Sequence, residues 1–297
     1  MSVHKEAFLN AQVDELTIGC YCIECETFDG DCRVNFAQKS AHPETVELKD
    51  KENFNSTSKI RSLKLFGIQM GDNKWNLDDI PHIDQLERLE ISNSMIKDPR
   101  FGLNNDVELR SAKMMTYERL NEFVFRNNGL RVLRSVNFLQ YFTNLKVVTL
   151  NDNQLAQIDP DAFRNLSLVE VNLERNRLEK LHENLFAKSP RLHETLKRLV
   201  LKENQLVELK DLMFSSLKNL EHLDLSRNRL ISLSERTFQG LLSLKELSLS
   251  FNPLKYIDVN TFRFISASLN RLDMISNSEA DWFVFDDNDI CMLAYFK

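Results

Sequence analysis

The chain has 297 residues, 42% of them hydrophobic, which is enough for one large domain or two small ones. The formal net charge is −6 and both signs are mixed along the chain, so there is no basic stripe for a phosphate backbone, and nucleic acid is disfavoured as a partner. The 7 glycines match neither a dinucleotide-binding motif nor a phosphate loop. No run of about 18 apolar residues is present that could span a membrane.

The N-terminal region, residues 1–58, contains a cluster of four cysteines in CYCIECETFDGDC: Cys20, Cys22, Cys25 and Cys32. Its first residues lack the charged start and apolar stretch of a signal peptide, so either the protein stays in the cytosol or the chain is incomplete. Four clustered cysteines suit either a zinc site or two disulfides. Zinc ribbons and fingers separate their ligand pairs by more than about ten residues. The tight cluster therefore favours disulfides over zinc, and both over free thiols.

From residue 59 to residue 279 the sequence repeats. Copies such as LKVVTLNDNQL from 145 and LEHLDLSRNRL from 220 align on an asparagine, which recurs at Asn128, Asn153, Asn176, Asn204, Asn228, Asn252 and Asn277. A phenylalanine follows ten residues after each of the first six, at Phe138, Phe163, Phe186, Phe214, Phe238 and Phe262, and a leucine or isoleucine stands halfway between. Two weaker copies precede them, IRSLKLFGIQM from 60 and LERLEISNSMI from 86. This period predicts a solenoid of stacked coils.

Each copy predicts one short strand, because Leu223 and Leu225 alternate with outward polar residues. Asn228 stands where the chain must turn out of that strand. Its amide can pair with backbone groups of its own coil and of the next coil. The phenylalanines are expected to stack as a spine, each contributing roughly 3–5 kcal/mol relative to alanine.

Two segments break the period. The 34 residues between Ser94 and Asn128 predict a protruding loop over about residues 95–120, and a smaller surplus at 187–195 predicts a bulge on the convex side.

These repeats resemble the leucine-rich repeat family over residues 59–279, and the pattern in SERTFQGL is similar to the extracellular type found in Toll-like receptors, slit, chaoptin and small leucine-rich proteoglycans. The resemblance implies an α/β solenoid: a horseshoe with a parallel concave β-sheet of about nine strands and irregular or short-helical convex segments. It also implies a cysteine cap with the pairs Cys20–Cys25 and Cys22–Cys32.

Residues 280–297 contain Cys291 in DDNDICMLAYFK, which is similar to the start of a C-terminal cysteine cap. Half a cap at this end and no signal peptide at the other predict a fragment of a secreted or cell-surface protein. The alternative is a lone buried cysteine in a complete protein. Two glycosylation sequons, at Asn55 and Asn165, are near chance frequency.

No catalytic constellation is found. The six histidines share no metal-ligand spacing, and paired acids such as Asp286 and Asp287 are expected to be solvated. The sequence therefore predicts neither an enzyme nor a cofactor or metal site.

A binding function is favoured, because about nine strands with three outward residues each match the roughly 20–30 residues that one side of a protein interface contributes. An apolar patch of Val124, Val147 and Thr149 on the concave face is expected to be its centre. The predicted contact residues are Glu122, Val124, Arg126, Val147, Thr149, Asn151, Glu170, Asn172, Glu174, Arg198, Val200, Lys202, His222 and Asp224. The favoured function is a secreted or surface recognition module for a protein ligand. The alternative is a cytosolic leucine-rich repeat scaffold or regulatory protein with reduced thiols.

Overall fold

The structure is a computed structural model that describes residues 15–19, 34–36, 44–46, 61–67, 74–76, 83–100, 117–134 and 138–275. Side chains are described for residues 61–67, 84–97, 117–134 and 139–275. The chain divides into two compact units: residues 1–130 with 141–145, and residues 131–140 with 146–297.

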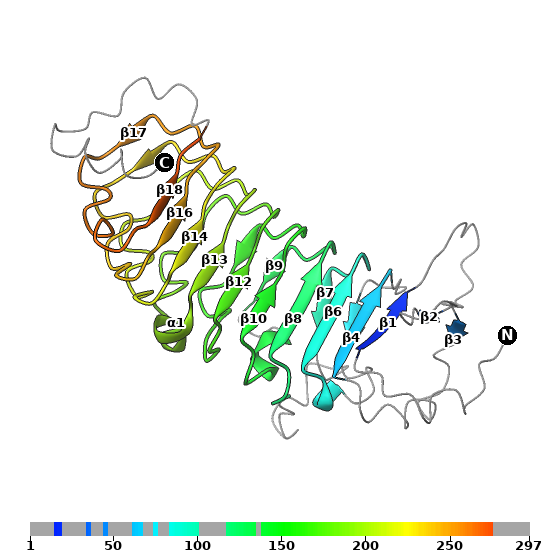
Figure 1. Ribbon diagram of the computed structural model, residues 1–297. Helices are drawn as coiled ribbons and strands as arrows, with labels where there is room; N and C mark the ends of the chain where they lie inside the picture. Colours follow the sequence, from blue (N-terminus) through cyan, green and yellow to red (C-terminus); the bar gives the residue numbers. More distant parts are fainter. Residues whose placement is uncertain are drawn as a thin grey trace. The chain divides into compact units, whose positions relative to one another are not determined.

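The first unit contains a sheet with four parallel strands in the order β8, β6, β4 and β1 (Figure 1). Their bounds are Glu122–Arg126, Arg88–Ser92, Ser62–Phe66 and Glu15–Gly19. Two antiparallel strands, β2 Val34–Phe36 and β3 Glu44–Val46, continue the sheet beyond β1. Strand β1 extends the solenoid sheet by one parallel strand that no repeat of the sequence predicts.

Strand β5, Lys74–Asn76, pairs in parallel with β7, Asp98–Arg100. The prediction of a loop from residue 95 onward is therefore wrong for residues 98–100, because their backbone groups pair with those of β5 from the preceding coil. A 3-10 helix, Ile83–Gln85, precedes β6.

The second unit contains six consecutive parallel strands. They are β10 Val147–Thr149, β12 Glu170–Asn172, β13 Arg198–Val200, β14 His222–Asp224, β16 Glu246–Ser248 and β18 Arg271–Asp273. Each starts at the residue that the repeat register predicts. The repeat strands β4, β6 and β8 of the first unit and these six strands confirm the predicted parallel solenoid of nine repeat strands.

The returning segments of the second unit are mostly turns. Short parallel pairs join β9 Val132–Leu133 to β11 Gln157–Ile158 and β15 Ser232–Leu233 to β17 Tyr256–Ile257. A 3-10 helix, η5, spans Phe138–Tyr141. The bulge predicted at 187–195 contains the helix α1, Pro190–Thr195, which starts with a proline at a position where its missing N–H costs nothing.

The asparagines connect neighbouring coils. Asn204 is buried, its Oδ1 accepts the Leu178 N–H at 3.1 Å, and its Nδ2 donates to Leu173 O at 2.9 Å and Leu201 O at 3.0 Å. Asn176, Asn228 and Asn252 bind in the same way. The asparagine therefore pairs with its own coil and the preceding one, so the prediction that it reaches the next coil is wrong. The residue before each buried asparagine has a left-handed φ of 50–59°, which turns the chain so that the amide points inward.

The predicted phenylalanine spine is present in the second unit. Phe163, Phe186, Phe214 and Phe238 are buried, and the ring centroids of Phe186 and Phe214 lie 5.7 Å apart. Phe262 is half-buried and stacks on Phe238 at 6.0 Å. The spine fills the side of each coil opposite the strand, so the strand's outward residues are released from core packing.

Candidate protein-binding face

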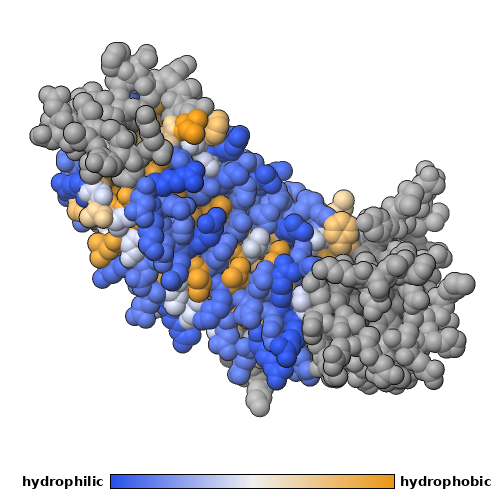
Figure 2. Space-filling model, viewed as in Figure 1, coloured by the Kyte–Doolittle hydropathy of each residue, from blue (hydrophilic) through white to orange (hydrophobic). Residues whose placement is uncertain are grey.

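In each unit, the face of the sheet opposite the core is formed by the outward residues of the strands, and it is called the sheet face below. These residues alternate with buried ones, as in the intermediate, buried, intermediate pattern of β10, β12 and β14. Cross-strand partners are in register, for example Glu170, Arg198, His222, Glu246 and Arg271 in one column. In the view of Figure 2, hydrophilic residues cover most of the described surface and hydrophobic residues appear in small groups.

In the first unit, the sheet face carries a network of four charges. Glu90, which is buried, accepts from Arg88 at 3.1 Å and from Arg126 Nη2 at 2.8 Å. Arg88 also contacts Glu122 at 2.9 Å. The sequence column contained Arg88 and Glu90, but neither was selected as a site residue, because alternation alone does not reveal which outward side chains become buried.

Val124 lies within this network, directly across from Glu90 on the neighbouring strand. Only 6% of Val124 is exposed. The expectation that its side chain offers open apolar surface is therefore wrong, because the long charged side chains around it cover it. Val124 belongs to the first unit and Val147 and Thr149 to the second, so the apolar patch across all three remains a prediction.

In the second unit, the first outward column starts with Val147 and continues with polar residues that pair locally. Arg198 Nε lies 3.6 Å from Glu170 Oε1, and His222 Nδ1 lies 3.1 Å from Glu246 Oε2. At the last of these strands, Arg271 binds Asp273 within its own strand at 3.0 Å, and this contact raises the arginine's pKa. Arg198 and Glu246 remain exposed despite their contacts.

The second column is less open than the alternation predicts. Val200 is buried between Asn172 and Asp224, its register partners on either side. Thr149, Asn172 and Asp224 of this column are half-buried, as is Val147 of the first column. Val200 therefore resembles Val124: its position is outward, but its neighbours cover it.

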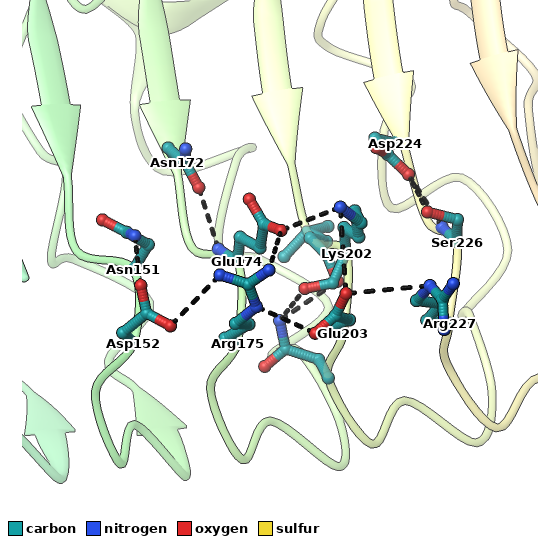
Figure 3. Close-up of polar contacts among 12 residues, drawn as sticks. Asn151, Asp152, Asn172, Glu174, Arg175, Lys202, Glu203, Asp224, Ser226 and Arg227 are labelled. Atoms are coloured by element: carbon teal, nitrogen blue, oxygen red, sulfur yellow. Dashed lines mark hydrogen bonds and ion pairs between the residues drawn. The ribbon is translucent and has the colours of Figure 1, made fainter. Parts of the chain in front are cut away.

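A second network lies where the strands end and the chain turns (Figure 3). Arg175 contacts Glu203 at 2.9 Å, Asp152 at 3.5 Å and Glu174 at 3.7 Å. The Arg175 hydrogen bond lowers the pKa of Glu203 and raises the pKa of the arginine itself. Lys202 binds Glu174 at 2.9 Å.

The network extends to the coils on both sides: in the preceding coil Asn151 donates to Asp152, and in the following coil Arg227 lies 3.7 Å from Glu203. Each surface ion pair contributes at most about 1 kcal/mol, but the network fixes the side chains at this rim in defined positions. The turn residues Arg175, Glu203 and Arg227 were not among the predicted contacts, and the signal that could have identified them is their constant place before the asparagine.

The opposite edge, where strands begin, carries a third cluster. Glu221 lies between Lys197, at 3.1 Å, and Lys245. Hydrogen bonds from Lys245 and then Lys197 lower the pKa of Glu221 to about 2. The two lysines therefore keep this carboxylate ionised over nearly the whole pH range.

Within the described residues there is no group of three or more His, Cys, Asp or Glu side chains that could hold a metal. The same residues contain no helix that is both long enough and apolar enough to cross a bilayer.

The predicted cap and one glycosylation site cannot be located on the described side chains: Cys20, Cys22, Cys25, Cys32, Cys291 and the Asn55 sequon lie outside them. Asn165 is exposed on the turn that follows Phe163.

The leucine-rich repeat family matches residues 118–178, 143–194 and 194–254. No curated protein matches the sequence. Among solved structures, the crystal structure of a TLR13–ssRNA13 complex is similar, with a TM-score of 0.53 and 22% sequence identity. The match covers 77% of this chain and 34% of that chain, so this chain spans about a third of the length of that relative. Together with the parallel sheet and the asparagine contacts, these matches show that the described residues form a leucine-rich repeat solenoid, and the family model itself matches within residues 118–254.

Proposed function

We propose that the chain is a non-catalytic recognition module that binds a protein ligand through its sheet face. The observation that carries the proposal is the separation of roles within each coil: leucines, phenylalanines and asparagines form the core, and most outward strand residues of the second unit are at least partly exposed. Six strands of the second unit alone present such residues in register. An ordered, mixed-charge surface of this kind suits the polar rim and scattered apolar contacts of a protein interface.

A protein ligand agrees better with the charges than a nucleic acid does. Arg198, Lys202 and Arg271 each lie beside a carboxylate on the sheet face, so a phosphate backbone would meet negative charge next to every cation. The ssRNA belongs to the TLR13 complex, and a likeness at 22% identity concerns the fold.

The proposal includes a secreted or cell-surface location, with Cys20–Cys25 and Cys22–Cys32 bridged in an N-terminal cap and glycans on Asn55 and Asn165. The exposed turn at Asn165 leaves the sheet face free of such a glycan. Peptide mapping of the secreted protein without reductant should find both bridges. One bound zinc and no bridges, or four free thiols, would contradict the extracellular location and favour the cytosolic scaffold.

The ligand-binding proposal is tested by screening the purified chain against a panel of secreted and cell-surface ectodomains. Arg198→Glu reverses an exposed charge at the centre of the sheet face and should weaken any specific complex about tenfold or more. Arg164→Glu is the matched control, because Arg164 is also exposed but lies beside Phe163 in a returning segment. A complex that loses affinity with Arg164→Glu but not with Arg198→Glu would contradict binding through the sheet face. Single-stranded RNA that binds the wild type but not Arg198→Glu would contradict a protein ligand.

A further inference from the structure

The segments that follow the turn of four successive coils form one surface, called the ascending flank: residues 175–180, 203–208, 227–232 and 251–256. Backbone hydrogen bonds hold these segments side by side. Val207 N–H donates to Glu179 O at 3.3 Å, Arg229 N–H to Leu206 O at 2.9 Å and Lys255 N–H to Ile231 O at 2.8 Å. Equivalent residues of the four coils therefore lie in rows across the flank.

Apolar side chains are exposed in the middle and at one end of this flank. Val207, Ile231 and Phe251 are 41–44% exposed and Tyr256 is 70% exposed. The row of Val207 and Ile231 holds Arg131 and Ala156 in the coils of Asn128 and Asn153. With about 150–250 Å² of surface per aromatic side chain, Phe251 and Tyr256 alone present on the order of 200 Å² to solvent. The exposed part of these side chains contributes nothing to folding, and such a patch is typical of an interaction surface.

The backbone conformation of Phe251 also indicates that the flank is an interaction surface. It has a left-handed φ of 59°, a conformation that costs an L-residue roughly 1–2 kcal/mol and that asparagine and aspartate tolerate best. The ring is exposed, with the Arg227 guanidinium 4.4 Å from its centroid. An aromatic residue at this turn therefore has a conformational cost, and 44% of its surface stays open to a partner beside its contact with Arg227.

The charges of the flank follow an order that is complementary to itself. The row three residues after the asparagines reads Glu179, Val207, Ile231, Lys255: acid, apolar, apolar, base. Among the described residues, the Glu179 and Lys255 side chains form no ion pair, and both are exposed. The row before the asparagines reads Arg175, Glu203, Arg227, Phe251, and Figure 3 shows its first three members on consecutive coils.

We propose that the ascending flank is the contact surface of a symmetric dimer with a second copy of this chain. A two-fold axis between the coils of Val207 and Ile231 reverses the order of the coils in the partner. The axis then places Val207 against Ile231 and Glu179 against Lys255, each contact occurring twice. In the turn row the same axis brings Glu203 of one copy to Arg227 of the other.

The same axis brings Arg175 to the exposed Phe251 ring, a cation–π pair. A second copy is preferred to a nucleic acid, because Glu179, Glu203 and Glu208 interrupt the cations of the flank. A contact between four coils of each copy buries an area at the small end of the range for specific interfaces. The dimer should therefore be weak and concentration-dependent, with a dissociation constant on the order of micromolar or higher.

Sedimentation equilibrium of the full chain over a concentration series tests the proposal. The wild type should shift from monomer to dimer, and Ile231→Glu should remain a monomer throughout. Leu242→Glu is the control, because Leu242 is also an exposed apolar residue, at 63%, but lies outside the flank. This variant should associate like the wild type. Unchanged thermal melting of both variants would show that neither exposed substitution disturbs the fold.

Exchanging the charges of Glu179 and Lys255 tests the predicted contact between them more directly, through the dissociation constant of the dimer. Glu179→Lys alone and Lys255→Glu alone each place two like-charge contacts in the dimer and should raise its dissociation constant about tenfold. The double variant restores opposite charges and should recover the wild-type constant. A wild type that stays monomeric at concentrations on the order of 100 µM, a dimer that survives Ile231→Glu, or a double variant no better than the singles would overturn the proposal.

Discussion

Replacing Asn204 by alanine tests the physical basis of the coil stacking. The Asn204 side chain is buried at a central coil and takes part in hydrogen bonds to Leu178 N–H, Leu173 O, Leu201 O and, at 3.3 Å, Lys202 O. Alanine fits the space but leaves these backbone groups without the amide, two of them in the preceding coil.

The expected loss follows from those contacts. A typical hydrogen bond contributes about 0.5–1.5 kcal/mol, and a buried group left unpaired costs about 1–3 kcal/mol. With three bonds of good length, Asn204→Ala should destabilise the local structure by roughly 2–4 kcal/mol. A tenfold change in an equilibrium is about 1.4 kcal/mol, so opening around Leu178 should become at least about 30-fold more frequent.

Native-state hydrogen exchange measures this opening at single amides. The Leu178 N–H should lose protection, whereas the Leu230 N–H, which Asn252 holds in the same way two coils later, should change much less. Asn219→Ala is the matched control, because Asn219 is exposed and has one hydrogen bond, to Glu194 O at 2.9 Å. Equal loss of protection in the two variants would refute the reasoning that the buried asparagines hold the coils together.

Phe214→Ala, in the buried spine, should cost about 3–5 kcal/mol in denaturant unfolding, whereas Phe251→Ala should cost less than about 0.5 kcal/mol; similar losses would contradict the spine. The pKa of Glu221 is depressed to about 2, so its lysine contacts stabilise the folded state above pH 4–5 and this contribution is lost as the pH falls toward about 2. Melting temperatures from pH 6 to pH 2 should therefore fall less in Glu221→Gln than in the wild type, and parallel curves would show that the depressed pKa has no role. Glu90→Ala removes the carboxylate between two arginines and should lower the melting temperature more than Glu246→Ala, an exposed partner of His222; the reverse order would contradict the burial of Glu90.

The sequence alone determined the period, the start of each of the nine repeat strands and the side of each strand that faces the core. This was possible because a solenoid coil contacts only its neighbours, so a residue's role depends on its place in the repeat. Asn204 and Phe214 could be given their roles from spacing alone.

Only the tertiary structure decided which outward residues are open. Val124, Val200 and Glu90 occupy outward positions, yet they are buried because the side chains of adjacent strands close over them. Coverage of this kind depends on the length and charge of side chains from coils more than 20 residues apart, which the repeat leaves free to vary. The tertiary structure also determined the direction of the asparagine contacts, the helix α1 and the strand β7. Each of these depends on which backbone groups of a neighbouring coil lie within hydrogen-bonding distance.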